Sequence, residues 1–269
     1  MKKLFLGIFM VAFLLFITAY GGGQDNDNAN NDTANNDNAD TQEISKITVG
    51  TEGTYAPFTF HNEEGELTGY DVEVIKEVAK RMDVEIEFME TQWDSMFAGL
   101  NAKRFDLIAN QVGINEDRLA NYDFSEPYTY STAVVVVPKD NNEITSFEDL
   151  KGKKSAQSLT SNYGAIAEQN GAELVGVEGI AQAIELIKQG RAEVTVNDKL
   201  AVLDYIKAQG DESIKIVAES EDVSEMAFAF NKGNEQLVAA INEQLAAMRE
   251  DGTLQKISVE WFGEDVSTK

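Results

Sequence analysis

The chain has 269 residues, 43% of them hydrophobic and only three of them proline, so it can bury one sizeable core or two smaller ones. Lysine and arginine number 22 against 47 acidic residues, and the formal charge of −25 argues against nucleic acid as a partner. The absence of cysteine and the single histidine, His61, exclude disulfides, thiolate metal sites and cysteine nucleophiles, and leave few routes to a histidine-based site. We therefore expect neither a metal nor a cofactor.

The first 45 residues are expected to serve export. Lys2 and Lys3 precede an apolar run over residues 4–19 that is short for a membrane span, so residues 1–23 predict an export signal. The alternative is a buried or membrane-spanning helix. Residues 24–45 are rich in Asn and Asp and predict a disordered tether.

The end of this signal resembles the lipobox of bacterial lipoproteins, but Tyr20 stands where the acylated cysteine would be. Lipid attachment is not possible at a tyrosine, so lipid anchoring is doubtful. We expect an exported protein, at the outer face of the cytoplasmic membrane or outside the cell. The leader could be retained as an anchor, cleaved near Ala19, or be a variant of a lipidated parent.

After residue 46, short apolar strands alternate with amphipathic helices, which predicts an α/β fold with open, largely parallel sheets. In the first series, Val72, Ile75 and Val78 lie on one face of a helix. The predicted strands of both series cover residues 47–51, 84–89, 105–112, 132–139, 153–159, 173–177 and 191–198. Further helices are predicted around 94–101, from Ser146 with Asp149 in a capping box, and over 180–189 and 235–250.

Two segments of the chain look like an internal repeat, although the similarity is short enough to arise by coincidence. Residues 103–110 and 190–197 share an arginine, an acidic residue and an asparagine at equivalent places. The alignment places Gln111 and Asp198 at the carboxyl ends of equivalent strands. Ligands of open α/β sheets bind at that edge.

The two series predict two lobes and a chain that crosses twice between them. The first lobe is expected over residues 46–128 and 225–269, and the second over 133–221. Residues 128–132 and 222–227 are expected to form the hinge.

Arg118 and Asp198 are the best candidates for binding a zwitterionic amino acid, which needs a fixed cation and a carboxylate. Arg118 follows a predicted strand by a short loop and offers planar, bidentate geometry. Alternatively, it is an exposed arginine paired with Asp117 or Asp123. Asp198 ends an apolar strand and could instead cap the helix that begins at Lys199, or do both.

Two aromatic residues, Tyr55 and Trp93, lie in predicted loops at strand carboxyl ends, where they can close over a ligand. Large aromatic residues are more often part of a core, and this is the alternative for both. Phe58, Phe60 and Trp261 are assigned to packing. No segment has a Walker or dinucleotide-binding pattern.

Several motifs resemble the family 3 extracellular solute-binding proteins, which serve polar amino acid ABC importers. The signature is Gly69-Tyr70-Asp71-Val72-Glu73-Val74, and the similarity runs over nearly all of residues 46–269, including 123–128, 149–153 and 261–263. The resemblance implies a two-lobed periplasmic-binding-protein fold of type II. Each lobe would be an open, mostly parallel sheet flanked by helices, with a two-strand hinge between them. It also implies a membrane permease as partner.

Within this family, residues 50–58, 92–94 and 110–112 are most similar to the cystine-binding members. The resemblance implies that Tyr55 and Trp93 sandwich the ligand and that Arg118 takes its carboxylate. The carbonyl of Gln111 and the carboxylate of Asp198 would take its ammonium group.

The chain departs from the family pattern at two places. Gly113 stands where relatives usually carry a threonine, which leaves only the main-chain amide for the ligand carboxylate. Thr160, Ser161 and Asn162 replace a Gly-Thr pair whose loop amides face the same group from the second lobe. Both departures change groups that face the ligand carboxylate in relatives.

The sequence as a whole predicts a monomeric solute-binding protein that captures extracellular L-cystine by hinge closure and delivers it to a permease. Glu52, Tyr163 and Asn197 are candidates for the second polar end of cystine. The alternatives are a binder of arginine, glutamine or lysine and, on the same fold, an enzyme resembling cyclohexadienyl dehydratases with Glu52 as general acid. A receptor's sensing domain is disfavoured because nothing follows Lys269.

Overall fold

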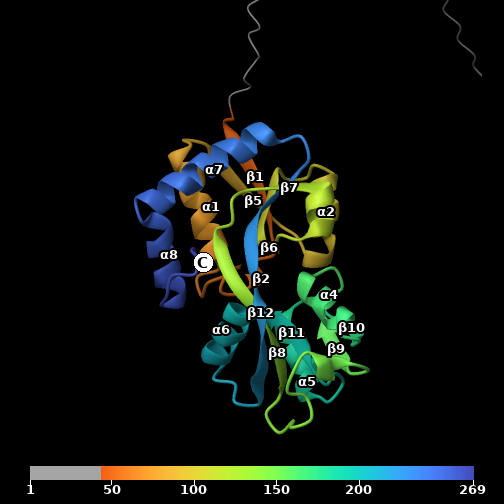
Figure 1. Ribbon diagram of the computed structural model, residues 1–269. Coiled ribbons are helices and arrows are strands. Elements are labelled where there is room, and N and C mark those ends of the chain that lie inside the picture. Colours follow the sequence, from red (N-terminus) through yellow and green to blue (C-terminus); the bar gives the residue numbers. More distant parts are fainter. Residues whose placement is uncertain (1–43) are drawn as a thin grey trace, which may run out of the picture. The chain divides into compact units, whose positions relative to one another are not determined.

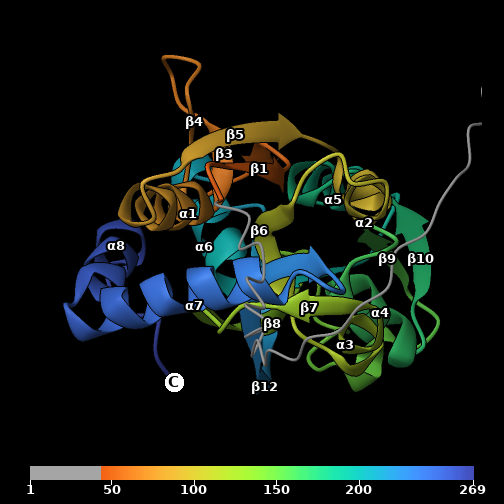
Figure 2. The same cartoon turned by 90° about the horizontal axis from the view of Figure 1, so that it is seen from above.

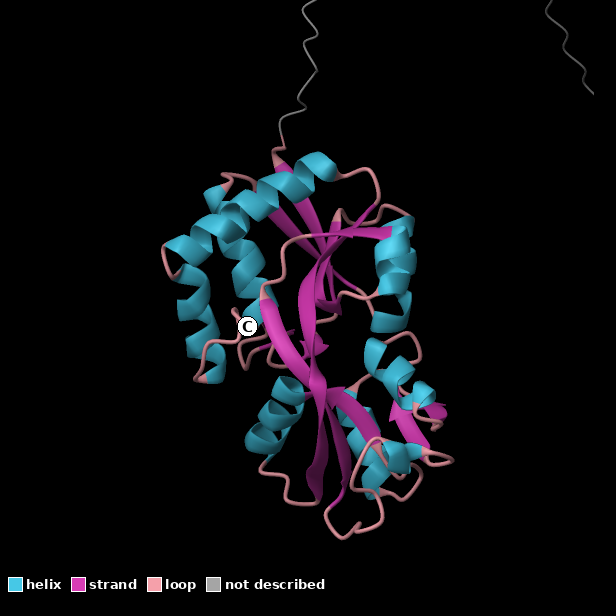
Figure 3. Cartoon of the chain, viewed as in Figure 1, coloured by secondary structure: helices cyan, strands magenta, loops and turns pink. Residues whose placement is uncertain are grey.

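The computed structural model describes residues 44–269, which belong to one compact unit of mixed α/β structure (Figures 1 and 3). The predicted export signal, Tyr20 and all but the last two residues of the predicted tether lie outside the described residues. Among the described residues, no helix combines the length and the apolar character needed to cross a membrane.

The first lobe is built on three parallel strands. They are β1 (Lys46–Thr51), β5 (Glu85–Glu90) and β6 (Leu107–Gly113), with β1 between the other two. Helices α1 (Tyr70–Arg81) and α2 (Trp93–Asn101) connect them in the predicted order. The predicted apolar face of α1 is confirmed, since Val72, Ile75 and Val78 are buried. A small antiparallel sheet is inserted between β1 and α1, made of β2 (Thr54–Tyr55), β3 (Thr59–His61) and β4 (Leu67–Thr68).

Two long antiparallel strands run between the lobes, β8 (Thr129–Pro138) and β12 (Ile214–Asn231). They lie side by side through the middle of the protein (Figure 1). Because β12 pairs with β6 on one side and β8 pairs with β11 (Thr195–Asp198) on the other, a single mixed sheet passes through both lobes. Short elements α3 (Glu116–Asn121) and β7 (Tyr122–Phe124) precede the first crossing.

The second lobe repeats the parallel arrangement on a smaller scale. Strands β9 (Lys154–Gln157) and β10 (Glu173–Gly176) are parallel, and a further bridge joins Ser155 to Val194 just before β11. Its helices are α4 (Asn162–Gln169), α5 (Ile180–Lys188) and α6 (Lys199–Gln209).

The helix predicted from Ser146 is wrong. Asp149 does accept hydrogen bonds from the amides and hydroxyls of Thr145 and Ser146, as a capping residue would. Only a three-residue 3-10 turn, Glu148–Leu150, follows, because Gly152 adopts a left-handed conformation (φ 75°) and turns the chain into β9.

The chain returns to the first lobe through α7 (Glu235–Glu250) and α8 (Thr253–Phe262), which pack against each other and against α1 (Figure 2). The bounds of α7 agree with the prediction. The fold class predicted from the sequence is confirmed by this arrangement. The predicted lobe and hinge boundaries stay predictions.

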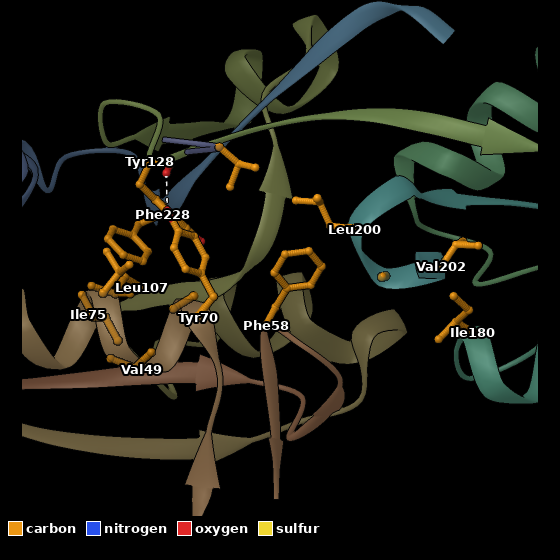
Figure 4. Close-up of a cluster of buried hydrophobic side chains, with 14 of the residues drawn as sticks. Val49, Phe58, Tyr70, Ile75, Leu107, Tyr128, Ile180, Leu200, Val202 and Phe228 are labelled. Atoms are coloured by element: carbon orange, nitrogen blue, oxygen red, sulfur yellow. Dashed lines mark hydrogen bonds between the residues drawn. The ribbon is translucent and has the colours of Figure 1, made fainter. Parts of the chain in front are cut away.

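One hydrophobic cluster extends from the first lobe into the second. Tyr70, Tyr128 and Phe228 are fully buried in its first-lobe part, and Phe58 lies near Leu200 of the second lobe (Figure 4). The two lobes therefore share packed side chains at their junction.

The internal repeat corresponds to a shared structural role. The carboxylate of Asp106 accepts a hydrogen bond from the amide of Thr48 in β1, at 2.7 Å, and that of Glu193 accepts one from the amide of Lys154 in β9, at 3.0 Å. In each lobe, an acidic residue just before one strand thus forms a hydrogen bond to the main chain of the neighbouring parallel strand.

Candidate functional site

A cavity lies between the lobes and is lined by residues of both. Six of the nine predicted ligand-binding residues line it, namely Glu52, Tyr55, Trp93, Gln111, Ser161 and Asn162. Tyr163 and Asn197, proposed for a second polar end, line it as well. Arg118, Gly113 and Asp198 are not among the lining residues. We call this space the inter-lobe cavity.

Arg118 is buried near the inter-lobe cavity, with 8% of its surface exposed. Its Nη1 donates to the carbonyl of Gly113 at 2.9 Å, and its Nη2 donates to the carbonyl of Thr160 in the second lobe at 3.3 Å. The guanidinium also lies 5.4 Å from the ring centre of Trp93 and 5.2 Å from that of Phe97. Burial lowers the pKa of Arg118 to about 10, so the group stays charged at neutral pH.

The alternative of an exposed arginine paired with an acidic neighbour is wrong. Within residues 44–269, no carboxylate forms an ion pair with Arg118, and Asp123 pairs with Lys232 instead, at 2.9 Å. A buried cation without an acidic partner is costly unless something neutralises it. The guanidinium of Arg118 is therefore suited to bind an anionic ligand group.

Asp198 is fully buried at the start of α6 and caps that helix. Its Oδ1 accepts hydrogen bonds from the amides of Leu200 and Ala201, and its Oδ2 accepts one from the hydroxyl of Tyr163 at 2.7 Å. Burial raises its pKa. The capping role is therefore present, and a role toward a ligand ammonium stays a prediction. Tyr163 connects Asp198 to the inter-lobe cavity, because Tyr163 lines it.

Tyr55 and Trp93 reach the inter-lobe cavity from the first lobe. The hydroxyl of Tyr55 donates to Oδ1 of Asn197 in the second lobe, at 3.0 Å. The loop positions predicted for both residues are wrong, since Tyr55 is the last residue of β2 and Trp93 is the first residue of α2. Trp93 also packs in a hydrophobic cluster with Met96 and Leu100. Trp93 is therefore both a core residue and part of the cavity wall.

Gln111 lies within β6 in a left-handed conformation, with φ of 49°, which is unusual for a residue other than glycine. Close by, a side chain at Gly113 would bring a Cβ within 3.3 Å of Nδ2 of Asn162 in the second lobe. The glycine thus allows the lobes to approach closely at this point.

The second lobe presents the start of α4 to the inter-lobe cavity. Ser161 caps this helix by accepting a hydrogen bond from the amide of Gly164, at 2.9 Å. A helix start offers unpaired main-chain amides and favours anions. Ser161 and Asn162 therefore lie where a ligand carboxylate could be shared with Arg118.

Glu52 is the only acidic or basic side chain that lines the inter-lobe cavity among the described residues. Its carboxylate accepts a hydrogen bond from Nδ2 of Asn110, at 2.6 Å. Burial raises its pKa to about 7. A carboxylate in such a place suits an ammonium group of a ligand.

Sequence reasoning missed Asp94 and Phe97 on α2. Asp94 accepts two hydrogen bonds from Thr160 across the lobe boundary, and Phe97 contacts the guanidinium of Arg118. Phe97 follows Trp93 by four positions and Asp94 by three, so helical spacing brings its side chain close to theirs, and this signal was available in the sequence. That their partners lie in other elements depends on the folded structure.

The chain matches the family described as bacterial extracellular solute-binding proteins, family 3, over residues 47–264. It is 54% identical over 268 residues to the L-cystine-binding protein TcyA of Bacillus subtilis (strain 168), a match that covers 99% of this chain and 100% of the relative.

Two solved structures are also similar. The L-cystine solute receptor of Neisseria gonorrhoeae, in its unliganded open conformation, is 51% identical over 84% of this chain and 95% of its own, with a TM-score of 0.57. An ancestral arginine-binding protein bound to arginine is only 34% identical, over 82% of this chain and 100% of its own, yet its TM-score is 0.77. The structure is thus more similar to that of the arginine-bound protein than to that of the open receptor, although the sequence identity is lower.

Proposed function

The chain belongs to the family 3 bacterial extracellular solute-binding proteins, and we propose that it captures L-cystine outside the cell for an amino acid ABC importer. Its relative of 54% identity over nearly the whole chain is an L-cystine-binding protein, and the similar protein of Neisseria gonorrhoeae is an L-cystine solute receptor. Cystine is delivered to a membrane permease after capture. The protein acts as a monomer, exported and without a lipid at Tyr20.

The observation that carries the proposal is the buried Arg118, which has no acidic partner within residues 44–269. The carboxylate of an amino acid replaces the two carbonyls that the guanidinium binds now. Amides at the start of α4, beside Ser161, share this carboxylate from the second lobe. The ammonium group binds the carbonyl of Gln111 and the carboxylate of Asp198.

The rest of the ligand is proposed to lie against the residues that line the inter-lobe cavity. Tyr55 and Trp93 enclose the disulfide-containing stem, and the second amino acid head lies toward Glu52. Cystine can react with any nearby thiolate, and a protein without cysteine cannot form a mixed disulfide with it. Many exported proteins also lack cysteine, so this last point is only supporting.

Capture works by closure of the lobes, for which residues 128–132 and 222–227 are the proposed hinge. In the structure these two segments pair with each other, for example Thr132 with Val223 and Tyr130 with Glu225. A ligand that contacts both lobes at once favours the closed state by its higher affinity for that state.

An enzyme on the same fold is the second candidate, because Glu52 has the raised pKa that a general acid needs. A dehydratase would convert prephenate or arogenate to an aromatic product. We propose that no bond is made or broken here, because the relative that matches nearly the whole chain is named as a binding protein. Incubation with prephenate and with arogenate should yield no aromatic product.

A thermal-shift screen of the exported form against the common amino acids and cystine tests the function directly. A ligand that binds only the folded state raises the unfolding temperature. We expect cystine to give the largest increase. No increase with cystine or with any amino acid would contradict the proposal.

A further inference from the structure

Asp71 carries a fully buried carboxylate in the first turn of α1, and the binding scheme above gives it no role. It accepts three hydrogen bonds. The amide of Gln111 donates to Oδ2 at 2.6 Å, Nε2 of Gln111 donates to Oδ1 at 2.6 Å, and the hydroxyl of Tyr128 donates to Oδ2 at 2.8 Å. Two of the three thus come from one residue, which lines the inter-lobe cavity.

Gln111 needs such support because its backbone is left-handed. For a residue with a Cβ this conformation costs about 1–2 kcal/mol. The pairing of β6 with β12 is irregular at the same place, with a register shift between Ala227 and Ala229. Regular strand pairing therefore does not hold Gln111, whereas Asp71 binds both its main chain and its side chain.

The same network reaches the strand that crosses between the lobes. Nε2 of Gln111 lies 3.1 Å from Oγ1 of Thr129, the first residue of β8. The hydroxyl of Tyr70 donates to the carbonyl of Tyr128 at 2.7 Å (Figure 4). The ring of Tyr128 stacks on Phe228 of β12, with ring centres 4.4 Å apart. Asp71 thus joins a residue of the cavity wall to both crossing strands.

We infer that Asp71 is a positioning residue for ligand capture: it holds Gln111 in the left-handed conformation that presents the main-chain carbonyl to the ligand ammonium. It also fixes that carbonyl relative to the start of β8, so that lobe closure brings Asp198 to the same ammonium. This inference rests on the proposed function, because it assumes an amino acid ligand.

The obvious alternative is a buried carboxylate that only stabilises the fold. The two roles differ in what happens when the backbone strain at Gln111 is removed. Glycine adopts a left-handed conformation without a steric penalty. If Asp71 acts by holding that conformation, a glycine at position 111 makes Asp71 less necessary for binding. If Asp71 only stabilises the fold, a glycine at position 111 leaves the effect of an Asp71 substitution on ligand binding unchanged.

The test compares Asp71→Asn, Gln111→Gly and the double variant by calorimetry with L-cystine, at a temperature where each is folded by circular dichroism. Asparagine at position 71 keeps the size of the side chain but cannot accept all three hydrogen bonds. We expect Asp71→Asn to bind cystine at least about tenfold more weakly than the natural protein. In the Gln111→Gly background, the same change should cost less than about threefold.

Asp211→Asn is the matched control for a loss of stability alone. Asp211 accepts hydrogen bonds from Ser213 and pairs with Lys188, away from the inter-lobe cavity. The Asp211→Asn substitution should lower the unfolding temperature and leave the affinity for cystine unchanged. The inference is overturned if Asp71→Asn binds cystine normally, or if its loss is equally large in the Gln111→Gly background.

Should Asp71→Asn not fold, Gln111→Ala and Gln111→Gly form the deciding pair. Both lose the side-chain bond to Asp71, but only glycine keeps the left-handed backbone without strain. The glycine variant is expected to bind cystine several-fold tighter than the alanine variant, and equal affinities would overturn the inference.

A failure of the proposed function is recognised separately, because the natural protein would then bind no cystine. In that case the backbone chemical shifts of residue 111, compared between the natural protein and Asp71→Asn without ligand, carry the test. The inference expects a change from left-handed toward extended values. Unchanged shifts would overturn it.

Discussion

The amide and the hydroxyl of Thr160 both donate hydrogen bonds to Oδ1 of Asp94, at 3.2 and 2.7 Å, and so join the second lobe to the start of α2. The carbonyl of the same residue accepts a hydrogen bond from Nη2 of Arg118. Thr160 is therefore held by the first lobe on two sides. These bonds link the two lobes, so we expect them to stabilise the present arrangement of the lobes even before a ligand adds its own contacts.

Asp94→Ala should favour the open state. Because both partners are exposed, the lost bonds are worth about 1 kcal/mol, and cystine affinity should fall about fivefold. Small-angle X-ray scattering of the ligand-free protein should show a larger radius of gyration. Asp117→Ala on α3 removes the same charge without touching Thr160 and should change neither quantity. Equal behaviour of the two variants would show that the Asp94 contact has no influence on closure.

Arg118→Ala should abolish ligand binding and leave the fold intact. A ligand carboxylate that loses its buried charged partner loses about 3 kcal/mol or more of binding free energy. Arg118→Lys should recover little of this, since an ammonium group cannot make the bidentate contact. Calorimetry gives the affinity, and circular dichroism checks the fold. Near-normal cystine affinity of Arg118→Ala would mean that the carboxylate binds elsewhere.

Trp93→Ala should weaken both ligand binding and the fold, because Trp93 lines the inter-lobe cavity and packs with Met96 and Leu100. Truncating a buried aromatic residue costs about 3 kcal/mol of stability or more. Trp93→Phe should keep most of the affinity.

Trp261→Ala is the control for this change. That tryptophan packs against Phe60 and donates a hydrogen bond to Glu73, away from the inter-lobe cavity. The Trp261→Ala variant should have a lower free energy of unfolding and an almost unchanged affinity for cystine. If Trp93→Ala loses stability alone, the ring is only a core residue.

Cystine affinity should fall as the pH drops from 7.5 to 5.5, by up to about tenfold per pH unit below the pKa of Glu52. Burial raises this pKa to about 7, so an ammonium group that needs the ionised carboxylate must displace a proton at lower pH. Calorimetry in two buffers of different ionisation enthalpy measures that proton release. The free energy of unfolding of the ligand-free protein should change in the opposite direction. It should fall as the pH rises from 4.5 through about 7, because the stability gained by protonating Glu52 is then lost.

Glu52→Gln isolates this effect, because burial also raises the pKa values of Asp71 and Asp198. The variant should bind cystine more weakly at pH 7.5 and lose most of the pH dependence. An unchanged slope would assign the pH dependence to the other two carboxylates.

Much of the fold could be predicted because its elements have regular apolar patterns, as in α1 and α7. The strand β12 could not, since residues 214–225 contain several charged and exposed side chains and only a short apolar run at 216–218. Its extended form is imposed by pairing with β8. Pattern reasoning fails where the partner strand, rather than the local sequence, determines the structure.

The parts of the candidate site that could be predicted are those where the type and position of a single residue indicate its chemical role. Arg118 was a candidate cation in a chain with few positive groups, and Asp198 was both a strand end and a helix start. The contact between Asp94 and Thr160 spans 66 positions of sequence and depends on how the two lobes pack, so no local pattern predicts it. The left-handed backbone of Gln111 is equally hidden, because the residue type gives no sign of it.

Competitive calorimetry of cystine against arginine, glutamine and cystathionine decides whether cystine is the ligand. Cystathionine keeps two amino acid heads and replaces the disulfide with a thioether. We expect cystine to bind tightest and cystathionine to compete better than either single-headed amino acid, because Glu52 and Arg118 are available for two heads. Tighter binding of arginine or glutamine than of cystine would contradict this account and make the protein a general polar amino acid binder.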